Sequence, residues 1–91
     1  MQVQNIIDTK TGKSVANQFI IMETNKRIFK SYKSIIVIIE DDGSLGNITL
    51  DEYHWNYSKT TSKYRNQFLS ETTAETQRKI NSGEYKLANL N

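Results

Sequence analysis

The residues of this chain that could do chemistry are concentrated between Tyr53 and Leu69. This segment holds three of the five tyrosines, the only tryptophan and the only histidine, together with Lys59, Lys63 and Arg65, and it contains no acidic residue. Cations interleaved with aromatic rings and hydroxyl groups can neutralise phosphates, stack on unpaired bases or contact another protein. The segment therefore predicts a binding surface and gives no catalytic site by itself.

Catalysis and metal binding have little support in the sequence. His54 follows Asp51 and Glu52, but a metal site needs several converging ligands, and this spacing matches no known metal motif. Ser58 is the first of four nearby hydroxyl residues, yet no base and orienting group accompany it in a recognisable triad. We therefore expect no enzyme activity, no metal and no cofactor, and we interpret His54 as structural.

Charge is unevenly distributed along the chain, although the net charge is only +2. Residues 26–33 carry four cations and no acid, and they add Lys30 and Lys33 to the candidate binding residues. Residues 40–52 carry five acids and no base. The folded protein could be bipolar, or the acidic segment could neutralise the basic strands, and the sequence leaves both outcomes open.

Size and composition limit the architecture. The 91 residues are enough for one domain over 1–91 with one small core, and no cysteine is present to add a disulfide or a thiolate metal site. The longest apolar run, Ile35–Ile39, is too short to cross a bilayer, and we see no secretory signal. We therefore expect an intracellular domain with no membrane contact.

The first half of the chain, about residues 2–53, has the pattern of β-strands. Short apolar runs rich in β-branched residues alternate with turn residues, and the run Ser34–Ile39 is typical of a strand buried on both faces. The segment 41–47 is rich in turn residues, and it predicts a hairpin that returns through Ile48–Leu50.

The second half changes to a helical period. Ser58 can cap a helix over about 59–70, in which Tyr57, Thr61, Tyr64 and Phe68 share a core-facing side. Lys59, Lys63, Arg65 and Trp55 are then expected to stay exposed.

A second helix is expected over about 73–82. Thr72 and Glu75 form a capping box at its start, and Gly83 can end it. An extended tail over 84–90 follows and can return to the sheet edge. The fold class is therefore α+β: a small antiparallel sheet of three to five strands, followed by two short helices packed on one face.

Three segments of the chain have a recognisable form. Residues 29–32 read F-x-S-Y, residues 55–63 read W-x-Y-S-x-T-T-S-K, and residues 80–85 read I-x-S-G-E-Y. In this order they resemble a group of small, mostly uncharacterised bacteriophage proteins, over about the last two thirds of the chain. The resemblance implies a phage or prophage source, and it brings no assigned activity or catalytic residue.

Three hypotheses follow. In the first, a non-enzymatic phage accessory protein in the host cytoplasm binds a host protein or ribonucleoprotein, for example to inhibit a nuclease or, as an anti-CRISPR, a CRISPR-type complex. In the second, the chain binds nucleic acid directly. In the third, it is a virion or assembly component whose segment Tyr85–Leu90 adds a strand to a neighbour's sheet. The oligomeric state stays open. The binding residues expected in the first two hypotheses are Lys59, Lys63, Arg65, Trp55, Lys30 and Lys33.

Overall fold

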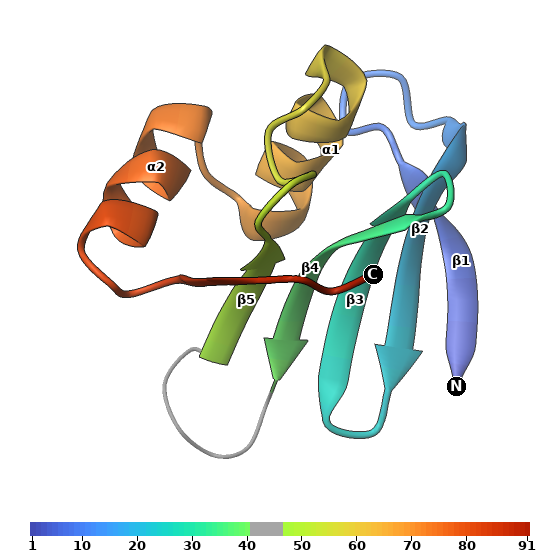
Figure 1. The fold of residues 1–91 in the computed structure, drawn as a ribbon. Helices are drawn as coiled ribbons and strands as arrows, with labels where there is room; N and C mark the ends of the chain where they lie inside the picture. Colours follow the sequence, from blue (N-terminus) through green and yellow to red (C-terminus); the bar gives the residue numbers. More distant parts are fainter. Residues whose placement is uncertain (41–46) are drawn as a thin grey trace.

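The computed structural model describes residues 1–40 and 47–91 of the chain. The turn expected over 41–46 lies outside the described residues. The described residues form six strands and two helices (Figure 1). In chain order they are β1 (Gln2–Ile7), β2 (Ser14–Glu23), β3 (Lys26–Ser31), β4 (Ser34–Glu40), β5 (Asn47–Asp51), α1 (Lys59–Leu69), α2 (Thr73–Asn81) and β6 (Lys86–Ala88).

The strands form one sheet in the order β1-β2-β3-β4-β5-β6. Neighbours from β1 to β5 are antiparallel, whereas β6 pairs in parallel with β5, where Leu87 lies opposite Leu50. The α+β class is confirmed, but the predicted antiparallel sheet of three to five strands is wrong in number and in type. The sixth strand is parallel because the chain passes through both helices before it returns, as a crossover connection requires.

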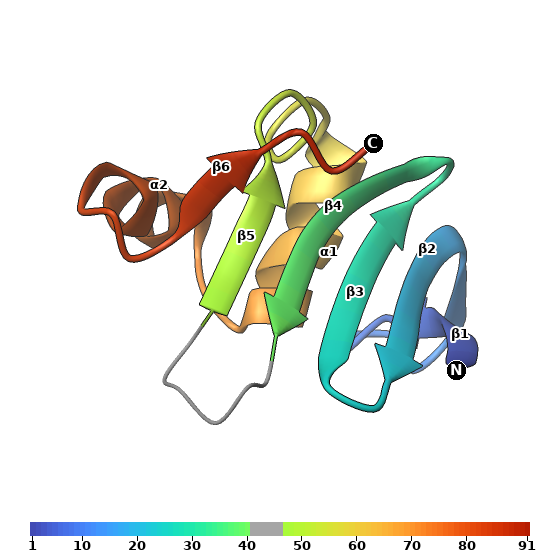
Figure 2. The same ribbon diagram turned by 60° about the horizontal axis from the view of Figure 1, so that its bottom comes forward.

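The hydrophobic core lies between one face of the sheet and α1. Phe29 and Leu50 are fully buried in it, and the Phe29 ring stacks on Phe68 of α1 with 5.7 Å between the ring centroids. On the same face, Ser31 and Thr61 are joined by a buried hydrogen bond of 2.8 Å between their hydroxyl oxygens. Figure 2 shows α1 behind the sheet.

The helix α2 lies beside the β5–β6 edge of the sheet (Figures 1 and 2). The expectation of two helices on one face therefore holds for α1 only. The chain must enter β6 at the β5 edge, which places α2 at that side, and Ile80 packs there against the core. None of the helices in the described ranges has the length and apolar character needed to span a membrane.

The helix ends are confirmed at the level of single atoms. The Ser58 side chain accepts a hydrogen bond from the Thr61 amide, and α2 begins with both hydrogen bonds of the capping box between Thr72 and Glu75. Gly83 follows α2 in the left-handed region at φ +83. These local signals depend on a few adjacent residues, so the predicted ends agree with the observed ones to within one residue.

Tyr57 is the exception on the predicted core face of α1. Thr61 and Tyr64 are buried and Phe68 packs against the core, but Tyr57 is half exposed. Ser58, the N-cap, has an extended backbone, so Tyr57 lies outside the helix and its side chain does not follow the helical period.

Candidate binding surface

Three connections and the start of α1 meet at one end of the sheet. The strands β1, β3 and β5 end there, and β2 and β4 begin there, because these neighbours are antiparallel. This end therefore gathers residues 8–13, the turn 32–33 and the loop 52–58, all at the top of Figure 1. The hydrogen bond between Ser31 and Thr61 fixes the first turn of α1 beside the end of β3.

We call this region the basic end. It carries five exposed lysine side chains, from two of the three connections and from α1. The only exposed carboxylate in the same segments is that of Glu52, because Asp8 is buried. The N-terminus of α1 adds the positive end of a helix dipole, with no acidic residue in its first turn. The five lysines are Lys10, Lys13, Lys33, Lys59 and Lys63.

Three tyrosines are exposed at the same end. Tyr53 is 71% exposed, Tyr32 is 54% exposed and Tyr57 is 50% exposed. Tyr32 also has a left-handed backbone with φ 56, and its amide donates to the carbonyl of Asn17 at 2.7 Å. This conformation is unfavourable for an aromatic residue, and such strain often marks a functional position. Tyrosine is one of the residue types that are enriched in energetically important contact sites.

Lys63 is tied to the chain's own carboxylate. Its Nζ lies 3.3 Å from Asp8 Oδ2 and 5.1 Å from the centroid of the Tyr64 ring, although 57% of its side chain stays exposed. The amide of Lys10 and the hydroxyl of Tyr64 also donate to Asp8, and these bonds hold the pKa of Asp8 well below its ordinary value. The hydrogen bond to Asp8 in turn raises the pKa of Lys63. Lys63 is therefore partly committed to the fold.

Lys59 and Lys33 keep the exposure predicted for them. Both side chains lie in water, and within residues 1–40 and 47–91 neither forms an ion pair. Lys59 and Tyr57 both line a shallow hollow of about 300 Å³ at the start of α1. The remaining lining residues are Asn56, Ser58 and Ser62.

The prediction that Arg65 is exposed on α1 is wrong, because its side chain is completely buried. The guanidinium donates to the Trp55 carbonyl, to Asn66 Oδ1 at 2.9 Å and to Thr73 Oγ1 at 2.9 Å. Burial lowers the pKa of Arg65. Arg65 follows the buried Tyr64 and faces the helix junction, so its charge serves the fold and is not available to a partner.

Trp55 and Lys30 are only partly available. The Trp55 ring packs against the core, and the Arg65 guanidinium lies 5.0 Å from its centroid. Lys30 is half-buried on the sheet, away from the helix α1. The structure thus brings Lys33, Lys59 and Lys63 to one end of the molecule, and it leaves Lys30 on a different face.

The carboxylate of Asp51, the last residue of β5, is also bound by groups of the chain itself. Asp51 is fully buried, and its carboxylate accepts from the His54 ring and from the amides of Tyr53, His54 and Leu90. Burial by itself raises the pKa of Asp51, but the bonds from Leu90 and His54 outweigh it and hold the pKa below its ordinary value. The His54 ring packs edge-on against Tyr57. This geometry fastens the loop 52–58 to the sheet.

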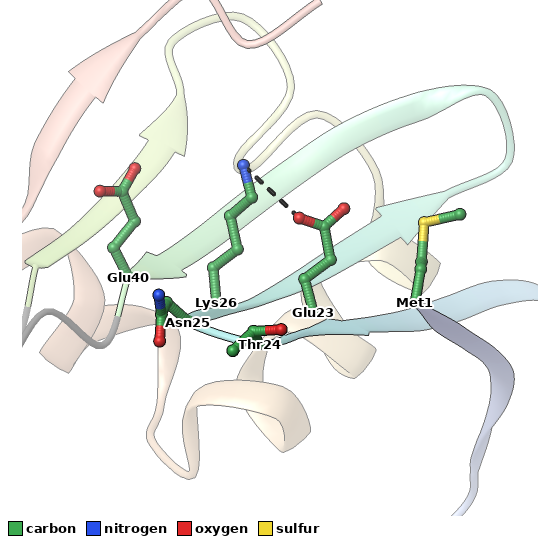
Figure 3. Close-up of a pocket in the computed structure, with 6 residues that line it drawn as sticks. All are labelled: Met1, Glu23, Thr24, Asn25, Lys26 and Glu40. Atoms are coloured by element: carbon green, nitrogen blue, oxygen red, sulfur yellow. Dashed lines mark ion pairs between the residues drawn. The ribbon is translucent and has the colours of Figure 1, made fainter.

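At the opposite end of the sheet, acidic and basic side chains lie beside one another. Lys26 lies opposite Glu40 across β3 and β4, and its Nζ is 3.8 Å from Glu23 Oε2 (Figure 3). Local neutralisation therefore applies at that end, whereas the basic end keeps its excess charge. Of the acids expected to cluster near Glu40, Asp41 and Asp42 lie outside the described residues.

Lys10, Lys13 and Tyr32 were not among the sequence-predicted site residues. Lys10 and Lys13 lie more than 40 positions from Lys59, and only the strand order brings their loop to the same end. Gly12 between them, a turn signal, shows that the segment forms a loop but not where the loop lies. In the part of the chain with described coordinates, no three acidic or histidine side chains are grouped to hold a metal ion.

The fold and the surface define a class: a small α+β domain with one sheet face covered by a helix and with a basic, tyrosine-rich end. The chain belongs to a family of unknown function (DUF8033), whose family model matches residues 1–84. The match spans β1 to β5 and both helices. No curated protein and no solved structure matches the chain.

Proposed function

We propose that this protein is a non-enzymatic phage accessory protein that binds a host protein or ribonucleoprotein in the host cytoplasm, and that the basic end is its contact surface. The single observation that supports this proposal is the gathering of five exposed lysines and three exposed tyrosines at one end, beside one exposed carboxylate. Inhibition of a host nuclease or of a CRISPR-type complex is its specific form, since such targets carry anionic surfaces or bind nucleic acid.

The chemistry of the basic end favours an acidic protein surface as the partner. Tyrosine anchors contribute large contact areas at low entropic cost, and lysines at the rim speed association with an acidic patch. The three tyrosines come from two different connections, so they offer separate anchors and not one continuous stacking platform. The hollow between Tyr57 and Lys59 gives a partner side chain a place to insert.

Direct nucleic-acid binding is the second candidate, and the same lysines support it. Each phosphate contact releases a counterion, so binding to a duplex would weaken with salt at a logarithmic slope of about 0.9 per contact. Lys63 is partly neutralised by Asp8, which leaves four lysines at this end without an ion pair in the described chain. The virion or assembly role is a third candidate, but its proposed strand is already used, because Lys86–Ala88 pairs with the chain's own β5.

The test is capture of a partner from host lysate with the purified protein as bait. We expect a stoichiometric protein partner that remains bound after nuclease treatment. The double variant Lys33→Glu with Lys59→Glu should lose this partner, because it places acidic groups where the partner's acids dock. Tyr53→Ala with Tyr57→Ala should weaken capture by at least about tenfold, the effect of losing a contact anchor.

The matched control is Arg78→Glu with Lys86→Glu, which changes the net charge equally but alters α2 and β6. It should retain the partner. Release of all bound material by nuclease would instead support direct nucleic-acid binding. Equal capture by both charge-reversed variants would contradict the proposal that the basic end is the contact surface.

A further inference from the structure

Gln18 of β2 is a completely buried polar residue whose side chain has no hydrogen-bond partner in the described part of the chain. Its exposure is 0%, and both Oε1 and Nε2 lack a partner. Buried amides are nearly always hydrogen-bonded, because an unpaired amide gives up its bonds to water on folding and gains none. Among the described residues, Gln18 is the only buried side chain whose polar atoms are all without a partner.

The strand register places Gln18 on the sheet face that contacts α1. Gln18 lies directly opposite Ser31 on β3, so the two side chains leave the sheet on the same side. The Ser31 hydroxyl is bonded to that of Thr61 in the first turn of α1, which shows that this side faces the helix. All three side chains are completely buried. An amide and two hydroxyl groups from β2, β3 and α1 are thus neighbours in the core.

The hydroxyl pair has one hydrogen-bonding proton left over. Two hydroxyl groups carry two protons, and the 2.8 Å bond between Ser31 and Thr61 uses only one of them. Within the described residues, neither hydroxyl forms a further bond that would use the second proton. The site therefore presents three kinds of unpaired group: a hydroxyl proton, the amide protons on Gln18 Nε2 and the acceptor Gln18 Oε1.

We propose that Gln18, Ser31 and Thr61 together bind one internal water molecule between the sheet and α1. The water accepts a hydrogen bond from Gln18 Nε2 and donates one to Gln18 Oε1, in the cyclic pairing that a primary amide and water can form. Its second lone pair accepts the remaining hydroxyl proton. Three hydrogen bonds are the usual number for a buried water, and they satisfy every kind of unpaired group at the site.

Other occupants fit this site less well. A cation would meet the amide protons and an anion would meet Oε1, whereas water both donates and accepts. The sheet is also irregular here: the pairing of β1 with β2 shifts between Asn5 and Ile7, and Asn17 has a left-handed backbone with φ 64. A bulge of this kind bends the strand, which favours a small gap beside Gln18. The inference is independent of the proposed function, although the water fastens the helix turn that carries Lys59.

The first test is oxygen-17 magnetic relaxation dispersion of the purified protein, which detects water molecules that stay bound for longer than nanoseconds. We expect Gln18→Met to hold one such water fewer than the wild type, because methionine has a similar length and no amide. The matched control is Gln4→Met, at an exposed glutamine of β1, which should hold as many as the wild type. Equal numbers in Gln18→Met and the wild type would overturn the proposal.

The second test is thermal unfolding of single and double variants. Thr61→Val should lower Tm less in the Gln18→Met background than in the wild type, because the bond through the water is already lost there. We expect a difference of about 4 °C or more, the shift that one hydrogen bond gives in a domain of this size. Tyr64→Phe is the control, since the Tyr64 hydroxyl donates to Asp8, and its effect should be the same in both backgrounds. Equal losses for Thr61→Val in the two backgrounds would contradict the proposal.

A high-resolution crystal structure of the wild type is a third test, which needs no variant to fold. An ordered water should lie about 2.7–3.2 Å from the Gln18 amide and from one of the two hydroxyl oxygens. A Gln18 amide bonded directly to another group of the protein, with no water beside it, would overturn the proposal.

Discussion

Arg65 is the largest side chain that the fold buries completely. Its guanidinium contacts Trp55 in the loop after β5, Asn66 in α1 and Thr73 at the start of α2. Neutral oxygen acceptors from three segments thus take the place of water around the guanidinium. Its Nε has no partner in the described structure. A buried cation held this way costs desolvation energy, which its hydrogen bonds to these acceptors offset in part.

Replacement of Arg65 by alanine should therefore destabilise the domain strongly. Arg65→Ala removes a donor shared by three segments and leaves a cavity where a fully buried side chain stood, for an expected loss of about 3 kcal/mol. Urea unfolding followed by circular dichroism measures this loss. The control Lys59→Ala, at an exposed position of the same helix, should change stability by less than about 0.5 kcal/mol. Equal effects of the two variants would contradict the structural role of Arg65.

The position of Arg65 shows where sequence reasoning fails at the residue scale. A helical period identifies the side of α1 that carries Tyr64 and Phe68, and that side is indeed buried. The burial of Arg65 depends on where α2 begins and how the loop 52–58 folds back, and neither follows from periodicity. Arginine is so seldom buried that an exposed position was the natural expectation.

At the scale of elements, the turn between β3 and β4 is the most unusual feature. Ser31 pairs with Ser34, so Tyr32 and Lys33 alone reverse the chain. Tyr32 takes the left-handed conformation that glycine or asparagine adopts more easily. A tyrosine that is strained and also exposed contributes little to folding, which favours a role in contact with a partner.

Tyr32→Asn should separate stability from binding. Asparagine tolerates the left-handed backbone, so we expect the variant to be more stable by about 0.5–1 kcal/mol. Partner capture should fall at the same time, because the exposed ring is lost. Thermal unfolding and capture assays on the same preparation measure the two effects. A variant that is less stable than the wild type would show that the ring supports the fold.

Elements defined by local signals were predictable, and those defined by distant pairing were not. The caps at Ser58 and Thr72 involve residues three positions apart, so the sequence contains the whole signal. The strand β6 has three residues, and its pairing with β5 spans more than 35 positions. Such a segment is too short for a reliable pattern, although its return to the sheet edge was expected.

At the scale of the whole molecule, buried carboxylates link two loops and α2 to the rest of the fold. Asp8 joins the β1–β2 loop to α1, Asp51 fastens the loop 52–58, and Glu71 joins α2 to the start of β6 through Tyr85 and Lys79. Burial raises the pKa of Glu71, but hydrogen bonds from Thr76, Tyr85 and Lys79 outweigh it and hold the pKa below its ordinary value. Burial and Glu71 raise the pKa of Tyr85 to about 12.

These carboxylates predict that the domain is sensitive to acid. Each has a lower pKa when folded than when unfolded, so its contribution is complete above about pH 5 and is lost as the pH falls through the folded value. Urea unfolding midpoints should therefore decrease steadily below about pH 5. In Asp8→Asn the midpoint at neutral pH should be lower and its decrease in acid shallower. An unchanged acid profile in this variant would contradict the role of Asp8.

Proteolytic cleavage after the buried Arg65 can also report on local opening of the native structure. A protease that cuts after basic residues can reach Lys10 in its exposed loop without any opening, whereas it can reach Arg65 only when the loop 52–58 and the two helices separate. The ratio of the two cleavage rates then measures how often that corner of the native molecule opens. A bound partner that slowed cleavage at Lys10 but not at Arg65 would be covering the surface without stiffening the interior.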